Sequence, residues 1–157
     1  MEATNNLLIF LLSNKKFALN LSDVVRVIPS VEITHLPNAP QVVLGIIQLQ
    51  KQIIPIVNIR LRFQLPPREI SLSDHIIIAK TSRRTVGLLV DSVYEVTGFD
   101  KHRVVPAEKI LPALRYIHGI IQLDDGLVII NDLDQFLSLD EEKELDIALN
   151  RSEIDNG

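Results

Sequence analysis

The sequence contains no cysteine and no tryptophan, and it has only six glycines among its 157 residues. Without cysteine, disulfides, thiol catalysis and cysteine-ligated metal sites are excluded, and the chain suits a reducing cytosol. It also lacks a phosphate-binding P-loop, a Gly-rich dinucleotide turn and a Gly-x-Ser-x-Gly elbow. We therefore predict a protein that is not an enzyme, with no catalytic residues and no cofactor.

Long hydrophobic runs are also missing. The apolar run near the N-terminus covers only Leu7–Leu12, whereas a membrane-spanning helix needs about 20 residues. No basic region precedes this run and no small-residue cleavage site follows it. We therefore interpret Leu7–Leu12 as a buried strand and expect a cytoplasmic protein without direct membrane insertion.

Positive charge and aromatic side chains are scarce. The net charge is −4, no basic run is longer than Arg83–Arg84, and the aromatic residues are five Phe and two Tyr. Proteins that bind nucleic acids usually combine a basic groove with aromatic stacking platforms. A small nucleic-acid-binding barrel is kept as an alternative, but this composition argues against it and we expect no nucleic-acid partner.

The residues that most often bind metals do not form a recognisable site. No two histidines share a spacing that would place them together on one helix face or on alternate strand positions, so we predict no metal site; they are His35, His75, His102 and His118. Asp124–Gly126 lacks the further acids of a calcium-binding loop and is interpreted as a hairpin turn. Asp91 is interpreted as a local side-chain cap rather than as a buried catalytic acid.

Segments rich in Val and Ile, separated by turn residues, predict an all-β protein. The expected strands lie at 7–12, 17–21, 42–49, 53–59, 75–79, 86–90, 117–123 and 127–130, and the short segment over 24–28 is interpreted as a turn or short helix. A polar turn is expected at Gln50–Gln52. The end of the chain differs, because Leu145, Ala148 and Leu149 follow helical spacing after an acidic first turn. This pattern predicts a short C-terminal helix over 139–150 and a loose tail over 151–157.

An internal repeat organises the chain. Gly45–Leu49 recurs identically as Gly119–Leu123, at an offset of 74 residues, and Phe17–Leu19 aligns with Val86–Leu88 at an offset of 69. Units this small cannot bury their apolar face alone. We therefore predict that each unit, roughly 7–65 and 75–138, curls into a five-stranded barrel and that the two subdomains pack together, intertwined.

Five motifs occur in an order that resembles the CheW-like domain, which is found in chemotaxis coupling proteins and in the regulatory domain of the histidine kinase CheA. They lie at 17–28, 33–40, 45–60, 86–93 and 115–133. The resemblance covers residues 7–138 and implies two SH3-like barrels without catalysis. It further implies an adaptor that binds the regulatory domain of a CheA-type kinase and the cytoplasmic tip of a chemoreceptor.

The resemblance also suggests partner-binding positions and reveals departures from the family pattern. The candidate positions are Arg26, Ile28, Gln50, Lys51, Arg60 and Glu95. Gln50–Lys51 replaces an Arg-Gly pair of the family, Asn58 stands where Asp is common, and Arg26 stands where an acid is common. Because the resemblance associates that arginine with coupling receptor to kinase, its replacement suggests a divergent member of such a family, and a scaffold of a non-chemotaxis chemosensory pathway is an alternative function.

Overall fold

The computed structural model describes residues 5–110, 116–124 and 126–156. Within these ranges the strands are β1 (Asn6–Leu12), β2 (Lys15–Asn20), β3 (Val24–Pro29), β4 (Val43–Leu49), β5 (Gln52–Val57), β6 (His75–Lys80), β7 (Thr85–Val90), β8 (Ser92–Gly98), β9 (Val105–Pro106), β10 (Ile117–Leu123) and β11 (Gly126–Asn131). The helices are η1 (Leu21–Asp23), α1 (Ile59–Arg62), η2 (Lys101–Arg103), α2 (Ala107–Ile110), η3 (Leu133–Gln135) and α3 (Leu139–Asn156).

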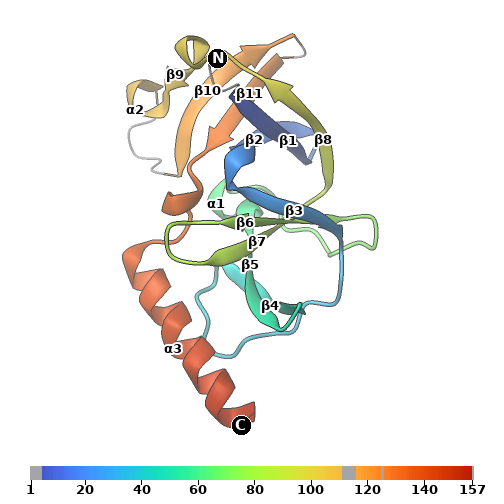
Figure 1. The fold of residues 1–157 in the computed structure, drawn as a ribbon, viewed down its shortest axis with the longest axis vertical. Helices are drawn as coiled ribbons and strands as arrows, with labels where there is room; N and C mark the ends of the chain where they lie inside the picture. The colour runs from blue at the N-terminus through green and yellow to red at the C-terminus, as the bar shows by residue number, and fades with distance from the viewer. Residues whose placement is uncertain (1–4, 111–115, 125, 157) are drawn as a thin grey trace.

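The strands form two sheets, one above the other in Figure 1. The first has the order β8-β1-β2-β11-β10-β9, and the second has the order β3-β6-β7-β5-β4. Each sheet holds five main strands, and the two-residue β9 extends the first. The prediction of a mostly β protein with two packed five-stranded units and a C-terminal helix is confirmed. Of the predicted Asp124–Gly126 turn, residue 125 lies outside the described residues.

The two sequence repeats exchange their first hairpins. Hairpin β1–β2 of the first repeat lies in the sheet that holds β8, β10 and β11 of the second, whereas β6–β7 of the second lies with β3, β4 and β5 of the first. The pairing is repeated in register: Leu8 pairs with Val96 as Ile77 pairs with Val27. The subdomains are therefore intertwined, and the prediction that each repeat curls into its own barrel is wrong, because each hairpin pairs with strands of the other repeat.

The buried side chains explain why strand β1 is a continuous apolar run. Leu8, Phe10 and Leu12 belong to a large cluster that draws on both sheets, while Leu7 and Ile9 belong to a cluster within the first sheet. Successive strand residues point to opposite faces, so both faces of β1 are buried. A third cluster lies within the second sheet and contains Ile47, Ile54, Ile56, Ile76 and Ile78.

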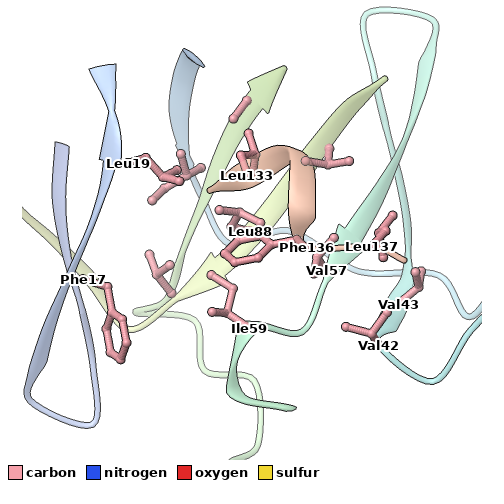
Figure 2. Close-up of a cluster of buried hydrophobic side chains, with 14 of the residues drawn as sticks. Phe17, Leu19, Val42, Val43, Val57, Ile59, Leu88, Leu133, Phe136 and Leu137 are labelled. Atoms are coloured by element: carbon pink, nitrogen blue, oxygen red, sulfur yellow. The ribbon is translucent and has the colours of Figure 1, made fainter. Parts of the chain in front are cut away.

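The large cluster joins the sheets through η3. Figure 2 shows Leu133 and Phe136 beside Leu88, Val57 and Ile59, which come from the second sheet and α1. Leu133 and Phe136 follow β11 of the first sheet, so one sheet supplies side chains to the interior of the other. Removing either sheet would expose this shared core to water.

Helix α3 begins at a capping box and packs against the sheets through one face. The Glu141 N–H donates to Ser138 Oγ, and the Ser138 N–H donates to Glu141 Oε1. Leu145 and Ala148 are buried as predicted, and Arg84 forms ion pairs with Glu142 and Asp146. The helix continues to Asn156, so the predicted end at 150 and the loose tail over 151–157 are wrong. No Gly or Pro occurs between Gly126 and Gly157, so neither residue stops the helix earlier.

Candidate partner-binding surfaces

Two strands at the ends of the sheets carry half of the candidate residues. β3 ends the second sheet and β8 ends the first, so each offers one row of backbone N–H and C=O groups to a further strand. Arg26 and Ile28 lie on β3, and Glu95 lies on β8. Arg26 and Glu95 are exposed, whereas Ile28 is half-buried against the cluster around Ile76.

The two edge strands are structural equivalents. Arg26 pairs with Ile78 and Glu95 with Ile9, two pairs related by the same offset of 69. A β-bulge interrupts each strand just before these pairs, at Val25 in β3 and at Tyr94 in β8. Bulges bend and twist an edge and so shape how a partner approaches it. The repeat therefore places opposite charges, Arg26 and Glu95, at one structural position of two different edges.

Apolar side chains are exposed on both edges. Val25 is 50% exposed on β3, and Val96 is 52% exposed on β8. Val27 and Tyr94 add to the same two surfaces, and Lys16 lies over the Tyr94 ring at 4.5 Å from its centroid. Exposed apolar side chains on a sheet edge are typical of a protein-binding surface. Sequence analysis missed Tyr94 and Val96 as surface residues, although the offset of 69 aligns them with Val25 and Val27.

Gln50 and Lys51 form the tip of the β4–β5 hairpin, as predicted. Leu49 pairs with Gln52, so the loop contains only these two residues. Both are exposed, and their φ angles are +49° and +68°. Two consecutive positive φ angles are typical of a type I′ turn, which favours glycine or asparagine. The tip therefore projects a polar pair into solvent at some backbone cost.

Arg60 is different, because its guanidinium is bound within the molecule. Its Nη2 donates to Asp91 Oδ1 at 2.6 Å and Oδ2 at 2.7 Å, and its Nη1 donates to Ser13 Oγ at 2.7 Å. The side chain is only 11% exposed. Arg60 thus fastens α1 to the β1–β2 turn and to the point where the chain leaves β7 for β8.

Asp91 is the centre of this ion-pair network. Besides Arg60, it accepts hydrogen bonds from the Ser13 N–H at 2.8 Å and from Arg68 Nη2 at 2.7 Å. Burial of Asp91 disfavours the charged carboxylate, but the hydrogen bonds from Arg60, Ser13 and Arg68 outweigh this effect and lower its pKa. The interpretation of Asp91 as a local cap is wrong, since its partners come from distant parts of the chain.

The described part of the chain offers no metal centre and no long apolar helix. Among residues 5–110, 116–124 and 126–156, no group of three or more His, Cys, Asp or Glu is arranged to hold a metal ion. The helices described in those ranges are all too short or too polar to cross a membrane.

Comparison with known proteins identifies relatives of this architecture. A family model of the CheW-like domain matches residues 6–141. The probable chemotaxis protein CheW of Rhizobium etli is 25% identical over 139 residues, which cover 87% of this chain and 90% of that protein. The chemotaxis protein CheW of Klebsiella aerogenes is 26% identical over 136 residues, covering 85% of this chain and 82% of the relative.

A solved structure shares the fold. The scaffolding protein TtCheW from Thermoanaerobacter tengcongensis superimposes with a TM-score of 0.80 at 29% sequence identity, covering 90% of this chain and 92% of the other. The residues matched by the family model include every strand described here, and therefore both edge strands as well as the Gln50–Lys51 tip. The chain belongs to the CheW-like domain family.

Proposed function

We propose that the protein is a non-catalytic cytoplasmic adaptor that couples chemoreceptors to a CheA-type histidine kinase in chemotaxis. Relatives named as chemotaxis proteins CheW, and a solved relative named as a scaffolding protein, support this role. The observation that carries the proposal is the pair of equivalent edge strands β3 and β8, which lie on different sheets around one shared core.

Each edge is suited to a different partner. An added strand gains main-chain hydrogen bonds from the edge and specificity from the side chains beside it. Arg26 on β3 favours an acidic partner surface, and Glu95 on β8 favours a basic one. One edge serves the regulatory domain of the kinase, and the other serves the receptor tip. Ile28 supports the β3 surface by packing against the apolar cluster of the second sheet.

Charge reversal at each edge tests the assignment. Titrations of the full chain against a kinase regulatory domain and, separately, a receptor-tip fragment measure both affinities. Arg26→Glu is expected to weaken one partner and Glu95→Lys the other, each by about ten-fold or more, because like charges then face each other. Lys143→Glu, an exposed charge reversal on α3, is the matched control. Loss of both partners in both variants, or of neither, would refute the two-edge assignment.

The tip residues favour a second candidate, the scaffold of a non-chemotaxis chemosensory pathway. Gln50 lacks the planar, charged donor fork of the arginine that is common in the family, and Lys51 points elsewhere as the next residue of a turn. A strain without the protein separates the two functions. Loss of directed swimming with intact motility supports the chemotaxis role, whereas normal chemotaxis supports the alternative pathway.

A further inference from the structure

The chain crosses between the sheets at two equivalent places, and their chemistry differs. The first crossover runs from β7 to β8 at Asp91, and the second runs from β2 to β3 through η1. Arg60 lies three residues after Val57, the end of β5, and Asp134 lies three residues after Asn131, the end of β11. The offset of 74 makes Asp134 the counterpart of Arg60.

The first crossover is closed by a guanidinium. Arg60 binds the Asp91 carboxylate and the Ser13 side chain, and the Ser13 N–H also donates to Asp91. In the second crossover Ser82, the counterpart of Ser13 at offset 69, donates its N–H to Asp134 Oδ1 at 2.6 Å. In both crossovers the N–H of the hairpin serine donates to a carboxylate. In the first crossover that carboxylate belongs to Asp91 and Arg60 supplies the cation, whereas in the second Asp134, the counterpart of Arg60, supplies the carboxylate itself.

A polar cavity of about 440 Å³ lies at the second crossover. Three carboxylates line it, from Asp23, Asp132 and Asp134, and the basic groups that line it are Lys80 and His118. The three carboxylates outnumber these two basic groups. Burial raises the pKa of Asp23, and the negative charges of Asp134 and Asp132 raise it further. Burial and the negative charge of Asp134 also raise the pKa of Asp132.

A buried amide provides a second and independent observation. Asn131 lines the same cavity and is only 2% exposed. Its Nδ2 donates to the Ala18 carbonyl at 3.0 Å, which leaves Oδ1 buried without a hydrogen-bond partner among the described residues. Its counterpart in the first repeat is the apolar Val57. An unpaired buried acceptor is costly and calls for an explanation, and a donor bound in the cavity would supply one.

We propose that this cavity binds the guanidinium of an arginine side chain from a partner protein. A guanidinium is planar and carries five N–H donors, which suits several convergent acceptors better than the point charge of an ammonium. The chain itself uses a guanidinium at the equivalent crossover, where Arg60 occupies the corresponding position. A divalent metal is disfavoured, since no described group of acids and histidines has the geometry to hold one.

Nuclear magnetic resonance titration of the full chain with N-acetyl-arginine-amide tests the inference. Saturable shifts are expected at the amides of Ser82, His118, Asp132 and Asp134, and the uncharged N-acetyl-citrulline-amide should produce none. Asp132→Asn should weaken binding about ten-fold, the loss expected for one charge-assisted hydrogen bond. Asp134→Arg should abolish binding, because it removes one of the three carboxylates and places an internal guanidinium at the position that Arg60 occupies in the first repeat.

Several outcomes would overturn the proposal. Equal shifts with the citrulline compound would show that charge plays no part, and unchanged affinity in Asp132→Asn would place binding elsewhere. Binding of free arginine without binding of the capped compound would indicate a small-molecule site instead. If Asp134→Arg does not fold, Asp23→Asn replaces it with the same expected direction as Asp132→Asn. Failure here leaves the edge-strand titrations, and with them the adaptor role, unaffected.

Discussion

Replacing Lys51 with glycine, with and without Gln50→Arg, separates two effects at the β4–β5 tip. Gln50 and Lys51 both adopt positive φ angles, +49° and +68°. A residue with a Cβ atom pays about 1–2 kcal/mol in this left-handed region. Glycine avoids that cost but loses more backbone freedom on folding, at about 0.5–1 kcal/mol. The net expectation for Lys51→Gly is a gain of about 1 kcal/mol in the free energy of unfolding.

The two substitutions should act on different quantities. Lys51→Gly is expected to raise the melting temperature by about 2–4 °C for a chain of this size and to leave partner affinity nearly unchanged. Gln50→Arg adds a charged donor fork at an exposed position, so it should leave stability unchanged. If the tip contacts a partner carboxylate, affinity for the receptor–kinase pair should rise about ten-fold or more, from one charge-assisted hydrogen bond.

The assay is a four-variant cycle of the wild type, the two single variants and the double variant, with thermal unfolding and binding titrations for each. The β1–β2 turn supplies a matched control, because Ser13 and Asn14 have φ angles of +52° and +65°. Asparagine tolerates this region, so Asn14→Gly should stabilise by less than Lys51→Gly. A larger gain at position 14 would refute the backbone argument. Equal affinities with and without the Gln50→Arg substitution would mean that the turn only closes a hairpin.

Three further expectations concern stability. Truncation after Leu139 removes the buried Leu145 and Ala148 and should lower the free energy of unfolding by about 2–4 kcal/mol, mostly from the leucine; an unchanged melting temperature would show that α3 contributes nothing. Asp91→Asn should destabilise by about 1.5–3 kcal/mol at neutral pH. Because the folded pKa of Asp91 is lowered, this stabilisation is present above its unfolded value and lost as pH falls, so the difference between wild type and variant in denaturant unfolding should shrink below about pH 4. The pKa of Asp132 is raised, so its charged form destabilises the fold. Asp132→Asn should therefore raise the free energy of unfolding at neutral pH, and this gain should disappear on acidification below about pH 4. A gain that persists below that pH would contradict the electrostatic cause.

Local patterns in the sequence predicted most of the strands, but they missed β3 and β8, where the repeat was interpreted as a short turn or helix, and they did not predict the long-range pairing. The run Leu7–Leu12 reads as a buried strand because both of its faces are covered. Gln50 and Lys51 read as a turn because they interrupt two apolar strands. The exchange of hairpins could not be read in the same way. Repeat offsets show which residues are equivalent, but not whether a strand pairs within its own copy or with the other.

The same limit applies to the candidate residues. Arg60 and Asp91 are far apart in sequence, and nothing local indicates that they meet as an ion pair at 2.6 Å. Asp91 follows a strand and precedes Ser92, a context that fits a cap equally well. Exposed apolar residues of an edge strand, such as Val96, resemble those of a buried strand. Only the position of the strand in the sheet tells the two apart.

The exchange of hairpins gives a physical reason why one chain can serve two partners. Each edge strand pairs with a hairpin of the other repeat, so β3 depends on β6 and β8 depends on β1. Val24 of β3 and Val93 of β8 pack against the shared core that holds Leu88 and Leu133. Two equivalent edges of opposite charge, Arg26 and Glu95, are therefore held in a fixed relation. On the two-edge assignment proposed above, a partner bound at one edge is positioned relative to a partner at the other without a conformational change, as a scaffold requires and as a flexible linker between two binding sites could not provide.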